Sequence, residues 1–272
     1  MSELVIEAGR TEGQYWRDLW RYRELFFFFA WRDMLVRYKQ TVVGISWSLI
    51  RPLLTMAVLT VVFGKFGKMP SGGAPYPLMV FCGMLPWLFF STAMMESSNS
   101  LVSNANMIAK VYFPRLTITA SSVMTSLVDF LISSVFLAVL MMWYRAVPPG
   151  EVVFLPFFVL LVFTASLGVG LWIAALMVKY RDFRFIVPFI VQFGLYISPV
   201  GFQSGVVPDR YRLIFALNPM VGIIDGFRRC LLGTTNSYYW PEVTIAVFDV
   251  ALLMISGIWY FRKTERTFAD VI

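Results

Sequence analysis

Long apolar segments recur along the chain from about Thr41 to Trp259, and most charged residues lie in the short stretches between them. An α-helix crosses the hydrocarbon core of a bilayer with roughly 20 consecutive apolar residues. Hydrophobic residues make up 58% of the chain and charged residues 14%, a balance outside the usual range of soluble globular domains. The sequence therefore predicts an all-α polytopic membrane protein.

Six transmembrane helices are expected, over residues 47–63, 78–95, 116–144, 152–178, 185–200 and 243–261. With both termini in the cytoplasm, most of the 23 basic residues fall on the inner side, as the positive-inside rule requires. The net charge of +7 follows from this bias, so no nucleic-acid partner is expected. We divide the chain into a cytoplasmic N-terminal part (1–40), a six-span domain (41–264) and a cytoplasmic tail (265–272).

An amphipathic helix is expected before the first span. Its apolar stripe consists of residues three or four positions apart, namely Tyr15, Leu19, Tyr22 and Phe26. Tryptophans and arginines on such a helix suit the headgroup region of the inner leaflet. The helix is either a simple anchor or a collar around a lateral entrance for a lipid-bearing substrate. The residues expected at that entrance are Trp16, Arg17, Trp20, Arg21 and Arg51.

The apolar piece Leu213 to Ile224 is too short to cross the bilayer, and Asn218-Pro219 interrupts it. We interpret residues 201–240 as a pair of re-entrant or interfacial helices before the last span, which would gate the outer side. An ordinary folded external loop is the alternative. The residues expected at this gate are Pro199, Tyr211, Asn218 and Pro219.

The segment 98–115 is polar in its first half and ends in aromatic and basic residues. An exposed Tyr112 and Phe113 would suit insertion into a cleft of a partner protein, because aromatic anchors often dominate interfaces. The alternative is a plain helix-turn-helix connection.

The chain lacks the residues of several kinds of chemistry. It has no GxxxxGK[ST] phosphate loop and no histidine, and its two cysteines, Cys82 and Cys230, form no CxxC motif. We therefore expect no metal site, no bound cofactor and no ATP hydrolysis by this chain itself. Asp129 lies deep in its span and is expected to face a partner or water, with a buried structural hydrogen bond as an equal alternative. Acidic residues do not cluster in one span, so ion-coupled transport has little support.

Several strings resemble, in the same order, the membrane subunit of bacterial ABC exporters of lipid-linked polysaccharide. The resemblance covers about Tyr15 to Thr264, and its strings are Arg32 to Thr41, Gly44, Trp47, Arg51-Pro52, Gly83 to Trp87, Asn104 to Arg115, Tyr180 to Asp182, Tyr196 to Val200 and Leu217 to Pro219. Members of that family carry O-antigen, capsule or teichoic-acid polymers, and the sequence does not separate these cargoes.

The resemblance implies a homodimer in the bacterial inner membrane, served by two separate ATPase subunits that bind ATP and Mg²⁺. The cargo would be an undecaprenyl-linked polysaccharide, exported outward. The same resemblance assigns 98–115 to coupling with the ATPase, through Asn104, Lys110, Tyr112, Phe113, Pro114 and Arg115. Residues 201–240 correspond to the outer gate helices.

Other interpretations remain at this point. One is an ABC permease for a small hydrophobic drug or lipid. Another is an intramembrane glycan-processing enzyme, whose nearest sign is a group of arginines at Arg210, Arg212, Arg228 and Arg229. Separately, Ser166, Gly170 and Ala174 form a line of small residues that permits close helix approach. We expect that line to serve packing within one subunit first and dimer contact second.

Overall fold

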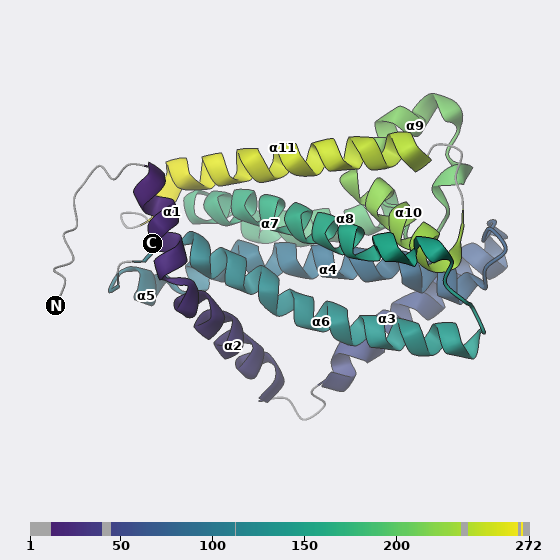
Figure 1. Cartoon of the computed structure of the whole chain (residues 1–272), viewed down its shortest axis with the longest axis horizontal. Coiled ribbons are helices and arrows are strands. Elements are labelled where there is room, and N and C mark those ends of the chain that lie inside the picture. Colours follow the sequence, from purple (N-terminus) through teal and green to yellow (C-terminus); the bar gives the residue numbers. More distant parts are fainter. Residues whose placement is uncertain (1–11, 40–44, 112, 235–238, 266–267, 269–272) are drawn as a thin grey trace.

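The computed structural model describes residues 12–39, 45–111, 113–234, 239–265 and 268, and these residues form helices and turns with no strand. Five helical segments are long and apolar enough to cross a membrane, and they run side by side (Figure 1). They are α3 (Ile45–Leu59) with the π-helical η1 (Thr60–Phe66), α4 (Tyr76–Ser103), α6 (Leu116–Trp143), η2 (Gly150–Phe154) with α7 (Leu155–Lys179), and α11 (Tyr239–Glu265). The predicted all-α polytopic fold is confirmed.

The fifth expected span corresponds to a shorter helix, α8 (Phe183–Ile197). Its 15 residues reach about 22 Å at 1.5 Å per residue, less than the hydrocarbon thickness of about 30 Å. The chain turns after Ile197, at the segment that holds Pro199. The count of six spans therefore stays a prediction.

Helix α4 forms the centre of the bundle, with most of its side chains buried among α6, α7 and α10. Close packing of α7 depends on glycine, because a Cβ on Gly170 would lie 2.4 Å from Ser97 Oγ of α4. A Cβ on Gly257 of α11 would likewise lie 2.5 Å from the Gly168 carbonyl oxygen of α7. Ser166, Gly170 and Ala174 are all buried, so the expected use of this small-residue line within the subunit is confirmed.

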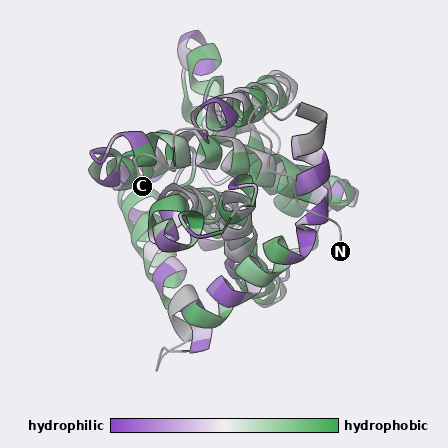
Figure 2. Cartoon of the chain, turned by 90° about the vertical axis from the view of Figure 1, so that its left-hand side faces the viewer, coloured by the Kyte–Doolittle hydropathy of each residue, from purple (hydrophilic) through white to green (hydrophobic). Residues whose placement is uncertain are grey.

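One end of the bundle, which we call the α5 end, carries α1 (Glu12–Arg21), the start of α2 (Arg23–Lys39), α5 (Ala105–Ile108) and the end of α11 (Figure 1). The expected amphipathic helix is present, although it ends at Arg21 and α2 follows after a turn at Tyr22. Tyr15, Leu19 and Tyr22 pack against an apolar cluster of the bundle. Figure 2 looks onto this end and shows hydrophilic and hydrophobic residues alternating along α1 and α2.

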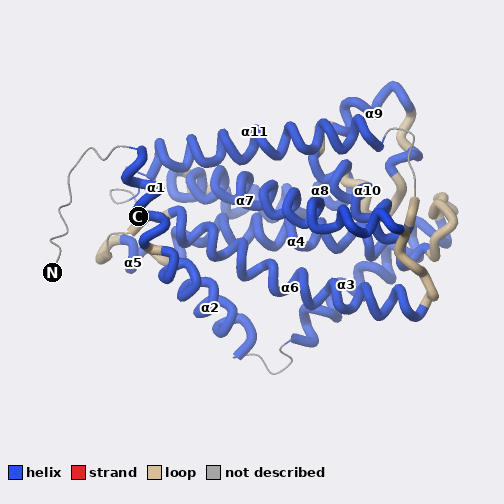
Figure 3. The backbone as a smooth tube through the Cα atoms, viewed as in Figure 1, coloured by secondary structure: helices blue, strands red, loops and turns tan. Residues whose placement is uncertain are grey.

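The opposite end, which we call the α10 end, carries η3 (Ser204–Val206), α9 (Asp209–Ala216) and α10 (Pro219–Leu232). The expected helical pair is confirmed, and its break lies at Leu217-Asn218. Helix α10 is buried against α4, α7 and α11, whereas most of α9 is exposed, so the gate and the folded external loop both stay open as interpretations. The longer turns of the described chain gather at the two ends (Figure 3), where we therefore look for function.

Candidate functional site

The α10 end is organised around Arg228, whose side chain is 1% exposed. Its guanidinium donates hydrogen bonds to the carbonyl oxygens of Val200 and Phe202, each at 2.8 Å, and to that of Met79 at 3.3 Å. Asp225, one turn earlier on α10, lies 3.7 Å away and balances the charge. One arginine therefore joins α10 to the start of α4 and to the turn after α8.

The predicted gate residues share this region. Asn218 caps α10, because its Oδ1 accepts from the Met220 backbone N–H at 3.1 Å, and Pro219 follows at the first helical position. The Asn218 Nδ2 donates to Ser198 Oγ at 3.0 Å, and Ser198 is next to the buried Pro199. The predicted gate residues Pro199, Asn218 and Pro219 therefore lie close together. Tyr211 instead lies on the exposed α9, where its ring packs under Arg210.

A second group of charged residues lies where the C-terminal part of α2 faces α4 and α6. Arg37 donates hydrogen bonds to Asp129 of α6 and to Glu96 of α4, and the Tyr38 hydroxyl donates to Asp129. The expectation that Asp129 faces a partner is confirmed, although the sequence did not identify Arg37 as that partner. We call these four residues the α2 charge cluster. It joins the N-terminal helices to the two central helices of the bundle.

Residues 98–115, which we call the coupling segment after their expected role, differ from the expectation in one important respect. Phe113 is 4% exposed and packs against Phe29 of α2, so its predicted exposure is wrong. The cause is the apolar cluster at this end, to which α2, α7 and α11 all contribute. Pro114 is buried as well, and Tyr112 lies outside the described residues. Lys110 and Val111 are exposed, as are Asn106 and Ala109 just before them.

Two polar residues of the coupling segment hold neighbouring elements. Asn104 Oδ1 accepts from Arg32 Nη2 of α2 at 2.9 Å. The backbone N–H of Arg115 donates to Glu265 Oε1 at 2.9 Å, and its guanidinium packs over Phe268. The segment is thus attached to α2 and to the end of α11, and these contacts could not be inferred from spacing along the chain.

Four of the five residues expected at the entrance lie on the outside of the α5 end. Trp16 and Trp20 are 45% and 72% exposed, and Arg17 and Arg21 are exposed beside them. Arg51 is exposed on α3, in the turn that also holds the buried Pro52. The exposed positions on α1 are compatible with contact with a lipid surface. Arg51 is separated from α1 along the chain by the whole of α2.

The four arginines considered as a sign of an enzyme do not converge. Arg228 is buried among carbonyl oxygens, Arg229 pairs with Glu151, and Arg212 pairs with Asp209. Arg210 stacks on Tyr211 instead. Within the described residues there is also no group of three or more acidic or cysteine side chains placed to hold a metal. The charged groups here connect neighbouring elements instead of facing a common site.

The sequence matches the family described as ABC-2 type transporter over residues 24–232. The chain belongs to the ABC-2 type transporter family. The match includes the coupling segment, the α2 charge cluster and the gate helices, so the family resemblance inferred from the short strings is confirmed. This membership places the chain among the membrane-spanning components of ABC transporters.

Individual relatives match this ABC-2 protein over almost their whole length. The O-antigen export system permease protein RfbA of Myxococcus xanthus is 29% identical over 259 residues, which are 94% of this chain and 98% of the relative. A Klebsiella pneumoniae protein of the same name is 26% identical over 242 residues, 89% of this chain and 92% of its own. The polysialic acid transport protein KpsM of Escherichia coli is 22% identical over 242 residues, 86% and 91% respectively.

Proposed function

We propose that this chain is the membrane subunit of an exporter that moves a lipid-linked polysaccharide outward across the bacterial inner membrane. Two copies would work with two separate ATPase subunits. The observation that carries the proposal is the end-to-end match to permeases named for O-antigen and polysialic acid transport. The chain contains no phosphate loop, which agrees with ATP and Mg²⁺ being bound by a partner.

The orientation follows from charge. The exposed cations Arg17, Arg21 and Lys110 lie at the α5 end, and the positive-inside rule favours the cytoplasm for such a group. The α10 end then faces outward, and both termini are cytoplasmic. This orientation places the coupling segment where an ATPase can reach it.

The pathway would run between two copies, along α3 and α8. Both helices are apolar yet poorly covered: only 11% of the apolar window of α3 is buried, and Val187 is the buried residue of α8. Near the α10 end, the turn after α8 contacts η1, which continues α3, through Phe202 packed on Phe63. The same turn contacts the start of α4, because the Tyr76 hydroxyl donates to the Gly201 carbonyl oxygen at 2.6 Å. A second copy facing this side would enclose a passage that one copy cannot form alone.

Helix α8 offers a surface suited to sugar rings. Phe185, Phe189 and Phe193 recur every fourth residue and are 55% to 79% exposed. The rings of Phe189 and Phe193 are stacked, with centroids 5.8 Å apart. Flat aromatic faces are apolar and tolerate changes in sequence along a polymer. We therefore assign this row of rings to the wall of the pathway.

Coupling to the ATPase would begin at Lys110 and Val111, two exposed residues of the coupling segment that lie close to Phe113 in the sequence. A push on this segment reaches α2 through Phe113 and Phe29 and reaches α11 through Arg115 and Glu265. The lipid carrier would enter beside Trp16, Arg17, Trp20 and Arg21, where aromatic rings and cations suit a phosphate-bearing headgroup.

The experiment is gene deletion with complementation. Deleting the gene should abolish surface polysaccharide while lipid-linked polymer accumulates inside the cell, because synthesis does not need the exporter. The intact chain should restore export only when its ATPase partner can hydrolyse ATP. Unchanged surface polysaccharide, with loss of efflux of a small hydrophobic compound, would favour a drug or lipid permease instead.

A further inference from the structure

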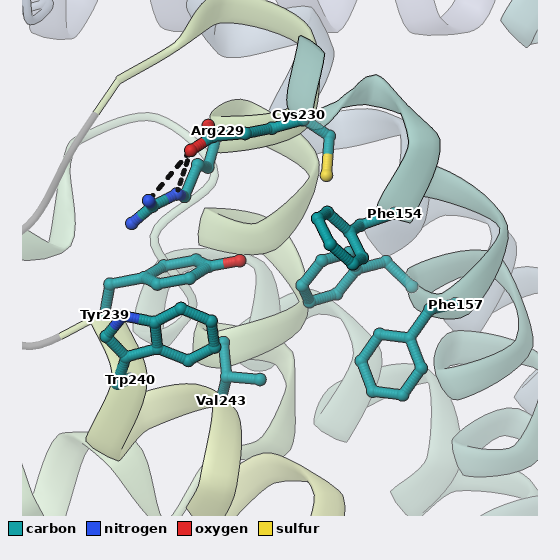
Figure 4. A pocket seen from close by; sticks show the side chains of 9 residues that line it. Phe154, Phe157, Arg229, Cys230, Tyr239, Trp240 and Val243 are labelled. Carbon is teal, nitrogen blue, oxygen red and sulfur yellow. Dashed lines mark hydrogen bonds and ion pairs between the residues drawn. The ribbon is translucent and has the colours of Figure 1, made fainter. Parts of the chain in front are cut away.

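A small cavity of about 140 Å³ lies at the α10 end between η2, the start of α7, α10 and the start of α11. Figure 4 shows aromatic side chains around it, with Phe154 and Phe157 on one side and Tyr239 and Trp240 on the other. Phe158, Cys230 and Val243 add to this apolar lining, and Glu151 and Arg229 are its charged residues. The surface of the cavity is therefore almost entirely apolar.

Local sequence explains the floor of this cavity. Phe158 is buried against α10 at Gly226, where a Cβ would lie 2.1 Å from the Phe158 ring. One turn later, α10 presents the small side chain of Cys230. Gly226 thus lets the Phe158 ring pack directly on α10, and the short side chain of Cys230 lines the cavity beside that ring.

The rim carries one ion pair. Arg229 Nη2 lies 2.9 Å from Glu151 Oε1, and these hydrogen bonds raise the pKa of Arg229. The same guanidinium stacks 4.3 Å above the Tyr239 ring. Because the pair has no net charge, it does not favour an anion over a neutral molecule. Specificity for charge is thus not expected at this rim.

The cavity opens at the level of exposed aromatic residues. Trp240 is 69% exposed and Phe154 is 62% exposed, while Trp143 at the end of neighbouring α6 is 82% exposed. Tryptophan and tyrosine are enriched where a protein crosses the boundary between hydrocarbon and headgroups. A cavity at this level is within reach of lipid chains from one leaflet.

The cavity lies on a different side of α10 from the proposed pathway. Arg228 points from α10 toward α4 and the turn after α8, whereas the next residue, Arg229, points to Glu151 and Tyr239. The lining residues come from η2, α7, α10 and α11, and none comes from α3 or α8. An apolar lining also leaves sugar hydroxyls without hydrogen bonds, which is unfavourable. The location and the chemistry both disfavour a glycan.

We propose that this cavity binds part of an acyl chain of a membrane phospholipid, taken from the leaflet at the α10 end. That leaflet is the outer one in the orientation proposed above, and only this assignment rests on the proposed function. A cavity of about 150 Å³ holds one benzene-sized apolar molecule. The site therefore takes a short stretch of one chain, and the bound chain lies against the helix that carries Arg228.

The test uses the complete complex in lipid nanodiscs that contain phosphatidylethanolamine with a diazirine on one acyl chain. After illumination, mass spectrometry locates the lipid adducts. We expect adducts concentrated on Phe154, Phe157, Tyr239 and Val243. Val243→Phe should reduce them to the level of an unilluminated sample, because the added ring occupies the cavity. Val247→Phe, one turn further along α11 and 39% exposed, should leave them unchanged.

Adducts spread evenly over exposed helix faces, or unaltered by Val243→Phe, would overturn the proposal. If Val243→Phe does not assemble, the adduct map of the unaltered chain decides alone, since the proposal requires the cavity residues to be enriched over exposed residues of α11 such as Phe248. The measurement needs neither ATP nor polysaccharide. Its failure is therefore distinct from a failure of the export proposal.

Discussion

The two ends of the bundle are held by different kinds of interaction. At the α10 end, a buried arginine and a capping asparagine make hydrogen bonds to fixed positions on the turn after α8. At the α5 end, a buried apolar cluster joins α2, α7, α11 and the coupling segment, and the hydrogen bonds of Asn104 and Arg115 around it are only partly buried. Hydrogen bonds demand particular distances, whereas apolar contact tolerates small shifts. Under the proposed function, this difference would give a gate with a defined closed shape and a coupling end whose parts move together.

The largest effect is expected from Arg228→Met at the α10 end. The substitution leaves buried carbonyl oxygens without donors and Asp225 without its cation, so the free energy of unfolding should fall by about 3 to 5 kcal/mol. Thermal unfolding in detergent and dye permeability of proteoliposomes would measure the loss and the resulting leak. Arg210→Met, on exposed α9, is the control and should change neither. Equal melting of the two variants would contradict a gate fixed by Arg228.

At the α5 end, two neighbouring positions should separate folding from coupling. Phe113→Ala removes a buried ring and should cost about 3 kcal/mol of stability. Val111→Asp changes an exposed position, so it should leave the melting temperature unaltered and reduce co-purification of the ATPase. Reversed results, with stability lost at Val111 and ATPase binding lost at Phe113 alone, would show that the coupling surface is assigned wrongly.

A smaller effect is expected at the α2 charge cluster. Arg37→Met leaves Glu96 and Asp129 without their shared donor, and hydrogen bonds to charged groups contribute about 1.5 to 3 kcal/mol. Amide hydrogen exchange should become faster in α2 and stay unchanged in α10. Arg23→Met, on the same helix but exposed, is the matched control. Faster exchange at both ends would mean that the two ends are not held independently.

The smallest effect on stability is expected from Arg17→Glu with Arg21→Glu. Each cation near an anionic leaflet contributes about 1 kcal/mol. The pair of changes should weaken polysaccharide export while the melting temperature stays constant. Arg210→Glu at the opposite end should have no such effect. Normal surface polysaccharide in cells with the double variant would reduce α1 to a passive anchor.

The parts of this structure that the sequence predicted rest on local signals. Asn218-Pro219 marks the start of α10 because asparagine caps a helix and proline fits its first turn. The length of the apolar stretches likewise located the five long apolar segments. The spacing of Tyr15, Leu19, Tyr22 and Phe26 predicted the amphipathic helix, and the structure adds that the first three of these pack against the bundle.

The missed features depend on residues far apart along the chain. The acceptors of Arg228 lie 149, 28 and 26 residues away, so nothing beside it in the sequence indicates its burial except Asp225 at i−3. Arg37 and Asp129 are separated by 92 residues. Phe113 seemed exposed because a polar stretch precedes it, whereas tertiary packing decides its environment. Helix α8 is shorter than its apolar run because the chain turns just before Pro199.

The central claim, that polysaccharide passes along α8, can be tested with a photoreactive phenylalanine analogue. Phe193 of α8 and Phe248 of α11 are exposed to a similar degree, 55% and 67%, and each would be replaced in turn. Illumination of exporting cells should attach polysaccharide at position 193 and not at 248, and blocking ATP hydrolysis by the partner should abolish the adduct. Attachment at 248 alone, or no ATP-dependent adduct at 193, would contradict the account.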